Sequence, residues 1–418
     1  MIQQLPKIEF FTTRGKLEAN KEQTVDVLLR ITPPEPQLTY NARPALNLSL
    51  VIDRSGSMEG EKMVRAREAA MFCVDQMLPD DRLSVVIFDE RIDVLFPSQQ
   101  VSNKQAMKDM ISRIKARGST ALHEAWVRGG LTVSERLLDV GINRVVLLTD
   151  GLANTGLTNT DEIVSQAMGL FKRGVSTSTI GIGEDFNEDL LLPMAQTAGG
   201  NAWHVVNADD MQRIFQVELE GLIAQFAHNV SLSLIPADGV RIADVLNDFE
   251  LTETGRYRLP NLQSGAPLEI VVQLRVGPQN DGSQIRLLDL RLGFTPQDAR
   301  AAEVVKEAFT VEFADSVRVE NLPVNHDVVK AVQFLMNSRA RNEAMKAMDL
   351  GQYDRAETLI GSALASTRVA CAQMGDDAKV REELFELQGA ALSLQDRLKD
   401  KLNRKLLAYG AYRHRTGK

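Results

Sequence analysis

Three oxygen-bearing side chains stand at alternate positions directly after an apolar run. The run LNLSLVI (46–52) leads into VIDRSGSMEGEK, which places Asp53, Ser55 and Ser57 at its end. In sheets of parallel strands, ligands bind beyond the carboxyl ends of the strands, so these side chains lie where a ligand site is expected. Taken alone, the triplet is explained equally well as a helix start, because Asp and Ser are preferred N-cap residues.

Two further segments favour the ligand site. Thr120 lies in RGSTALHEA at another loop-to-helix junction, and Asp150 follows a second apolar run in VVLLTDGLANTG. Both loops are expected at the same sheet edge as Asp53. Carboxylates and hydroxyls are hard ligands, and Mg²⁺ takes six oxygens while keeping some of its waters. The sequence therefore predicts a magnesium site made by Asp53, Ser55, Ser57, Thr120 and Asp150, with manganese or calcium as alternative ions.

Short apolar runs alternate with amphipathic stretches between residues 46 and 226. The runs lie at 46–52, 83–88, 143–149, 175–182 and 202–206, and helix-like stretches lie at 60–78, 103–114, 121–138, 160–172, 187–198 and 208–225. Strands that are apolar on both sides, each followed by a helix, are typical of a parallel sheet covered on both faces. This pattern predicts a doubly wound α/β domain with a mostly parallel sheet.

The flanking segments have a different texture. Residues 1–45 read as strands (IEFFTT, TVDVLLRI), and 227–315 return to strands separated by Gly- and Pro-rich turns. A lone hairpin is barely stable in water, so we expect both segments to form one antiparallel β-sandwich into which the domain at 46–226 is inserted. Residues 316–418 are predicted to be helical. We expect a three-helix bundle, whose last helix covers 376–407 without a break.

Composition limits the class of protein. The chain has 418 residues, with 48 Lys and Arg against 56 Asp and Glu and a net charge of −8. An acidic chain is a poor nonspecific ligand for nucleic acid. The two cysteines, Cys73 and Cys371, exclude a disulfide scaffold. We expect neither a signal peptide nor a membrane span, and therefore a cytoplasmic protein.

The five predicted ligands resemble a known family motif. Their order, Asp-x-Ser-x-Ser, then Thr, then Asp, is similar to the metal-ion-dependent adhesion site of von Willebrand factor type A (VWA) domains. The resemblance covers residues 46–225 and includes STIGIGEDFNEDLLLPMAQTAGGNAWHVV, which resembles the closing elements of bacterial members. It implies that the hydroxyls bind the metal and that the aspartates do so directly or through water. It also implies that an Asp or Glu of a partner protein supplies the last ligand.

An enzyme is disfavoured by what the motifs lack. A magnesium-dependent phosphatase with an aspartyl nucleophile needs a second carboxylate two residues later, where this chain has Ser55. His123 and Glu124 begin a zinc-helix pattern that fails at Val127, and the chain has no Gly-x-x-x-x-Gly-Lys loop. We expect a protein-interaction module without catalysis. The alternative is a regulatory or co-chaperone subunit for a MoxR-like AAA+ ATPase, or a partner in a kinase–phosphatase signalling set.

Overall fold

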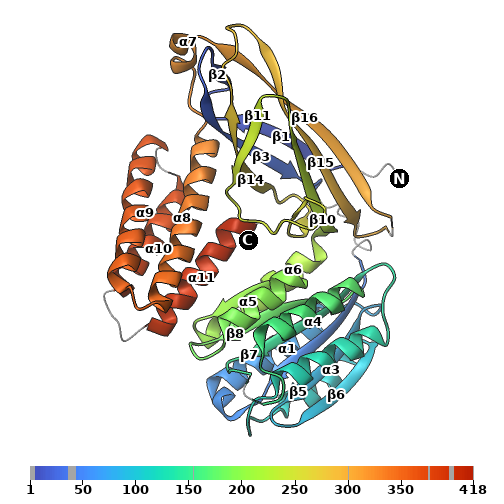
Figure 1. The fold of residues 1–418 in the computed structure, drawn as a ribbon. Coiled ribbons are helices and arrows are strands. Elements are labelled where there is room, and N and C mark those ends of the chain that lie inside the picture. Colours follow the sequence, from blue (N-terminus) through green and yellow to red (C-terminus); the bar gives the residue numbers. More distant parts are fainter. Residues whose placement is uncertain are drawn as a thin grey trace. The chain divides into compact units, whose positions relative to one another are not determined.

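The chain divides into two compact units (Figure 1). The computed structural model describes residues 5–35, 44–153, 155–299, 301–374, 377–394 and 400–417. One unit, called here the α/β unit, comprises Gln37–His228 and Pro296–Ala301. The other, called the flanking unit, comprises Met1–Pro36, Asn229–Thr295 and Ala302–Lys418. Each unit is described by itself.

A six-stranded sheet forms the middle of the α/β unit, in the order β6-β5-β4-β7-β8-β9. Its strands are β4 (Leu46–Asp53), β5 (Arg82–Phe88), β6 (Ile92–Gln100), β7 (Ile142–Thr149), β8 (Ser176–Ile182) and β9 (Gly199–Val205). Neighbouring strands pair in parallel except β6, which runs antiparallel to β5. The mostly parallel α/β sheet predicted from the sequence is confirmed.

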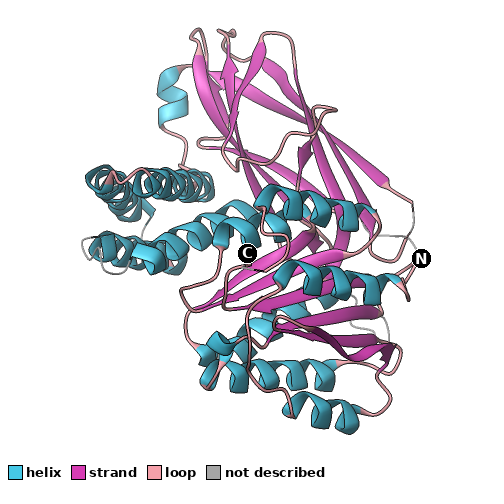
Figure 2. Cartoon of the chain, turned by 60° about the horizontal axis from the view of Figure 1, so that its bottom comes forward, coloured by secondary structure: helices cyan, strands magenta, loops and turns pink. Residues whose placement is uncertain are grey.

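Helices cover both faces of this sheet (Figure 2). They are α1 (Glu61–Gln76), α2 (Lys104–Ser112), α3 (Leu122–Ser134), α4 (Thr160–Lys172), α5 (Glu188–Thr197) and α6 (Met211–Ile223), with single 3₁₀ turns at Gly56–Met58 and Ala208–Asp210. Leu48 and Leu50 of β4 belong to one core with residues of α1 and α6. Val51, the residue after Leu50, points to the opposite face, towards Gly129 of α3. Both faces of β4 are therefore buried, and the polar side chains of Asn47 and Ser49 are hydrogen-bonded in the interior.

Strand β6 is a difference from the prediction, which placed no strand between 88 and 103. It lies at the edge of the sheet, and its pairing with β5 is irregular on either side of Val85. Pro97 interrupts the run IDVLFPSQQ, which is why it did not read as a strand. Proline is tolerated here because edge strands and bulges leave backbone N–H groups without a required partner.

Two sheets form the strand-rich part of the flanking unit. Their strands are β1 (Lys7–Thr12), β2 (Lys16–Glu18), β3 (Gln23–Thr32), β10 (Gln225–Pro236), β11 (Val240–Val245), β12 (Tyr257–Arg258), β13 (Leu262–Gln263), β14 (Leu268–Val276), β15 (Gln284–Pro296) and β16 (Glu303–Ala314). One sheet has the order β1-β3-β14-β11, and the other the order β12-β10-β15-β16-β2, with β13 beside β10. The N-terminal strands thus pair with strands far along the chain. That the sheets make a single sandwich, with domain limits at 45, 226 and 315, stays a prediction.

The C-terminal region is helical, as predicted. Its helices are α7 (Ser316–Glu320), α8 (His326–Asp349), α9 (Tyr353–Met374), α10 (Ala378–Leu394) and α11 (Asp400–Thr416). The first half of α8 packs on β3 and β14, and its second half shares a core with α9, α10 and α11. The expectation of one unbroken helix over 376–407 is wrong, since α10 and α11 are separate helices. On α11, Leu407 is buried in the core shared with the other helices, whereas the adjacent Leu406 is 42% exposed.

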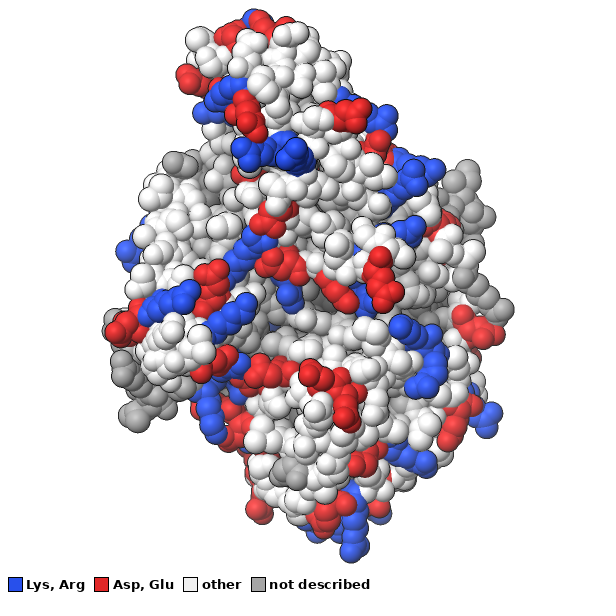
Figure 3. Space-filling model, viewed as in Figure 1, with Lys and Arg blue, Asp and Glu red and all other residues white. Residues whose placement is uncertain are grey.

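Acidic and basic side chains are interspersed on the surface shown in Figure 3. Within the described residues, no helix combines the length and the apolar character that crossing a lipid bilayer requires.

The strand pairing predicts that residues 227–315 do not fold without the N-terminal strands. β3 lies between β1 and β14 and pairs with β14 from Leu268 to Val276. Without it, β14 loses a full ladder and its buried neighbours. We expect 227–315 alone to show no cooperative thermal transition, and expect one after co-expression with 1–45. A cooperative melt of 227–315 that is unchanged by 1–45 would contradict the inserted arrangement.

Candidate metal centre

Strand β4 ends at Asp53, whose carboxylate is fully buried at the carboxyl edge of the α/β sheet. Its Oδ1 accepts a hydrogen bond from the backbone N–H of Ser55 at 2.8 Å. Its Oδ2 accepts one from the hydroxyl of Thr149, the last residue of β7, at 2.6 Å. Because β4 and β7 are adjacent parallel strands, their ends meet at one edge. The sheet therefore fixes this carboxylate from two strands.

The two serines connect Asp53 to Asp150. Ser55 Oγ lies 3.1 Å from Ser57 Oγ. Ser57 Oγ donates to Asp150 Oδ1 at 2.7 Å. Asp150 is fully buried, whereas Ser57 is exposed. The chain of polar atoms thus runs from the interior of the sheet edge to the surface.

Thr120 completes the group. It stands just before α3 and is buried. A methyl group built on Gly151 would lie 3.3 Å from Thr120 Oγ1 and 3.9 Å from Asp53 Oδ2, so both oxygens border the same small volume. The structure therefore brings all five predicted side chains together, although they come from three loops.

The electrostatics of Asp53 differ from those of a surface carboxylate. Burial raises the pKa of Asp53 to about 6, against the lowering effect of the hydrogen bonds from Thr149 and Ser55, and the negative charge of Asp150 adds to the rise. A nearby cation favours the charged form of a carboxylate and would lower this pKa again. The arrangement is one in which a positive charge is favourable.

Lys62 already supplies such a charge. Its Nζ lies 2.6 Å from Asp150 Oδ2, and it comes from the first turn of α1. The carboxylates and hydroxyls are hard oxygen donors of the kind that Mg²⁺, Mn²⁺ and Ca²⁺ prefer. The residues present thus fit a divalent cation. Sequence reasoning missed Lys62 and Thr149. The polar end of the run VVLLT was a signal for Thr149, but 88 residues separate Lys62 from Asp150.

A second network holds the loops that carry the ligands. Asp89, fully buried, lies 2.9 Å from Nε of Arg54 and accepts a hydrogen bond from Nε of Arg117 at 2.6 Å. The backbone of Asp89 accepts from the N–H of Ala121 at 2.9 Å. Gly118 has φ +73°, and a methyl group there would collide with Glu90. Asp89 therefore joins the loop after β4 to the loop before Thr120.

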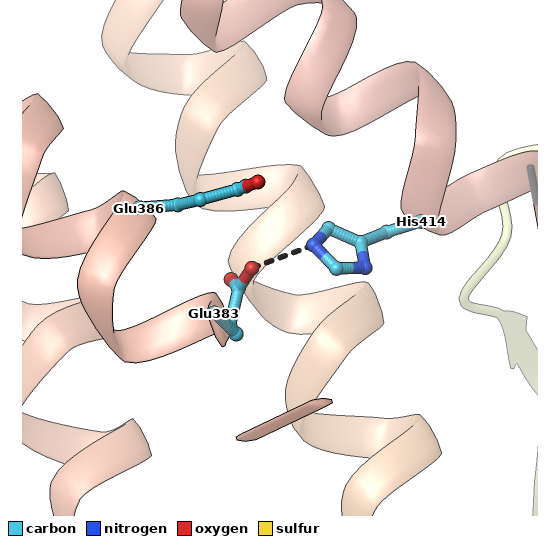
Figure 4. A group of neighbouring side chains, drawn as sticks. All are labelled: Glu383, Glu386 and His414. Atoms are coloured by element: carbon cyan, nitrogen blue, oxygen red, sulfur yellow. Dashed lines mark hydrogen bonds and ion pairs between the residues drawn. The ribbon is translucent and has the colours of Figure 1, made fainter. Parts of the chain in front are cut away.

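A second cluster of possible ligands lies in the flanking unit. Glu383 and Glu386 of α10 and His414 of α11 bring ligand atoms within 4.8 Å of one another (Figure 4). His414 Nε2 lies 2.7 Å from a Glu383 oxygen. However, Arg341 lies 2.9 Å from Glu383, and Arg413 donates to Glu386 at 2.7 Å. Two guanidinium groups already balance the two carboxylates, so this cluster is an ion-pair network that fastens α11 to the bundle.

Comparison with known proteins identifies the α/β unit. Residues 47–218 match the family model of the von Willebrand factor type A domain. The chain therefore contains a VWA domain, in the region where the sequence motif predicted one. Domains of this family are generally metal-dependent protein–protein interaction modules.

Curated relatives match about the same region. The chain is 31% identical over 188 residues to sll0103 of Synechocystis, covering 45% of this chain and 44% of that protein. It is 26% identical over 193 residues to YfbK of Escherichia coli, covering 46% of this chain and 34% of that protein. The chain thus matches less than half the length of these bacterial relatives.

Solved structures share the fold over most of the chain. A von Willebrand factor type A protein from Catenulispora acidiphila has a TM-score of 0.69 at 19% identity, covering 93% of this chain and 90% of that one. The ArnB paralogue VWA2 from Sulfolobus acidocaldarius has a TM-score of 0.59 at 16% identity, covering 98% and 99%. At these identities the likeness shows the fold alone.

Asp89 should matter more for stability than its exposed neighbour Asp93. Asp89→Asn removes a fully buried charge from beside Arg54, and we expect it to lower the free energy of unfolding by about 2–3 kcal/mol. Asp93 is half exposed and also contacts Arg54, so Asp93→Asn should cost less than ~1 kcal/mol. Urea unfolding of both variants measures this. Equal losses would contradict the role given to Asp89.

The ion-pair network predicts an acid-sensitive contribution from Glu383. Burial alone would raise the pKa of Glu383, but the hydrogen bond with His414 and the charge of Arg341 lower it from 4.5 to about 2. This stabilisation is fully present above pH 4.5 and is lost as the pH falls towards 2. We expect Glu383→Gln to lower the free energy of unfolding by about 3 kcal/mol at pH 7.

The gap between Glu383→Gln and the wild type should shrink as the pH falls from 4.5 to 3. Urea titrations followed by circular dichroism across this range measure it. A gap that is constant with pH would show that the charge of Glu383 is not what stabilises the bundle.

Proposed function

We propose that this chain is a metal-dependent protein-interaction module. In this proposal Asp53, Ser55, Ser57, Thr120 and Asp150 hold a magnesium ion, and an Asp or Glu of a partner protein completes the coordination. The observation that supports it is the convergence of two buried carboxylates and three hydroxyl groups at one sheet edge.

The division of charge between the ligands explains how such a site recognises a partner. Asp53 and Asp150 supply the negative charge, whereas the serines and Thr120 supply neutral oxygens. A magnesium ion held by these residues would supply an electrophilic centre to which a carboxylate of a partner could bind. Because the hydroxyl ligands are neutral, they would not reduce the positive charge of the ion, which would favour an acidic ligand. Exposed Ser57 marks the side from which that ligand can approach.

The proposal includes no catalysis. At the second position after Asp53 the chain has Ser55, which cannot act as the acid or base of a phosphoryl transfer at neutral pH. A regulatory role beside an AAA+ ATPase or in a kinase–phosphatase set would use the same site, and the identity of the partner would decide it. The cytoplasmic location expected from the sequence remains part of the proposal.

The metal site is tested by calorimetry with Mg²⁺ and Mn²⁺. Asp53→Ala should abolish binding, since it removes one of the two charges that balance the cation. Thr120→Ala should weaken binding by about tenfold, because one neutral ligand is lost. Neither variant should lower the free energy of unfolding by more than ~2 kcal/mol. Asp75→Ala is the control, since this exposed aspartate pairs with Lys108 outside the site.

Partner binding is tested by affinity capture with Mg²⁺, with EDTA, and with Asp53→Ala. A partner of the proposed kind is captured with Mg²⁺, lost in EDTA and lost with the variant. Undiminished metal binding by Asp53→Ala would refute the assignment of the site. Capture that is the same in all three conditions would refute metal-dependent recognition.

A further inference from the structure

Lys62 makes an ion pair with a group that the proposed metal also needs. Its ammonium lies 2.6 Å from Asp150 Oδ2. Ser57 donates to the other oxygen, Oδ1, at 2.7 Å. Both oxygens of this buried carboxylate are therefore engaged, one by a hydroxyl and the other by a full positive charge. The Lys62 side chain is itself 33% exposed, so it reaches from the surface into the site.

The surroundings of Lys62 allow it to leave. Its end passes beside Gly183, where a methyl group would lie 3.6 Å from Nζ and 3.7 Å from Cε. Lysine has a flexible stem of four carbons, and its ammonium is readily hydrated. Because a third of the side chain is already exposed, a change of rotamer at the cost of the ion pair would carry the ammonium into solvent.

We infer that Lys62 is an internal cation that competes with the divalent ion for Asp150. The inference rests on the proposed metal site. A divalent ion bound to Asp150 would repel an ammonium group only a few ångströms away, so the ion and Lys62 occupy this carboxylate in turn. Lys62 thereby stabilises the metal-free form and lowers the affinity for metal.

The same exchange defines two states of the site. In the metal-free state the ammonium neutralises one of the two buried carboxylates. In the metal-bound state the ammonium is released towards the exposed rim, near the side from which an acidic partner would approach. Metal binding thus turns an internal ion pair into a free positive charge at the surface.

Lys62→Met tests the inference, because it keeps an unbranched apolar stem and removes the charged end of the side chain. We expect Mn²⁺ and Mg²⁺ to bind about five- to tenfold more tightly than to the wild type. We also expect a lower melting temperature in EDTA, since Asp150 loses its counter-ion, and a larger rise in that temperature when metal is added. Lys62→Arg keeps the charge and should stay within about twofold of the wild-type affinity.

Arg65→Met is the matched control. Arg65 lies on the same helix, its side chain is 35% exposed, and it pairs with Glu61, Glu68 and Asp209 rather than with Asp150. The Arg65→Met variant loses one positive charge of similar exposure but keeps the Lys62–Asp150 pair. Its metal affinity should therefore equal that of the wild type. An equal gain for Arg65→Met would mean that general charge explains the effect, which would overturn the inference.

The remaining outcomes separate the two proposals. Metal binding by the wild type with no gain in Lys62→Met would overturn the inference and leave the metal site standing. No binding by either protein would refute the metal site and the inference with it. Binding by Lys62→Met but not by the wild type would support the inference in its strongest form. Circular dichroism at 20 °C confirms that each variant is folded, and Lys62→Gln replaces Lys62→Met if it is not.

Discussion

Two carboxylates, Asp53 and Asp150, are buried side by side at the end of the α/β sheet, and the site is built around keeping them there. A buried charge is costly unless it is paired or hydrogen-bonded. Parallel strands place both groups at one edge because β4 and β7 are neighbours. The sheet thus brings two negative charges together in its interior, and residues that follow the strands, such as Ser55, Ser57 and Lys62, stabilise them.

Another buried carboxylate in the same unit, that of Glu218, is stabilised in a different way. Burial alone would raise the pKa of Glu218, but the charge of Arg144 and hydrogen bonds from Ser178, Asn201 and Trp203 lower it. Asp53 is instead held by neutral donors, and its pKa is raised. The negative charge of Glu218 is thus balanced by a buried side chain of the protein, Arg144. Asp53 therefore lies where a further positive charge would lower its pKa.

Features encoded by local pattern could be predicted from the sequence. The apolar runs located the strands of the parallel sheet, and the position of Asp53 and Asp150 after two of them located the candidate site. Strand β6 was missed because Pro97 interrupts an edge strand. The separation of α10 from α11 was missed because helical periodicity carries no information on where a chain changes direction. Whether the five side chains bind a metal is still a prediction.

Contacts between side chains that are distant in the sequence could not be predicted, for a different reason. Lys62 and Asp150 meet only because α1 begins beside the end of β7, and Arg54 and Asp89 meet through the pairing of β4 with β5. Charged residues are common at loop ends, and their type alone does not identify the partner. Such ion pairs can be predicted only after the fold is known.

Helix α3 sets a mechanical limit on the site. A methyl group at Gly129 would lie 2.4 Å from Val51 Cγ2, so the helix backbone already rests against β4. A glycine within a helix costs roughly 1 kcal/mol relative to alanine, and here that cost allows close seating. Thr120 lies just before α3, which is packed closely against the sheet. The segment at 113–121 that leads to it contains Gly118 in a left-handed conformation. The helix therefore cannot move closer to β4, so a shift of Thr120 towards a ligand would have to come from the segment that precedes α3.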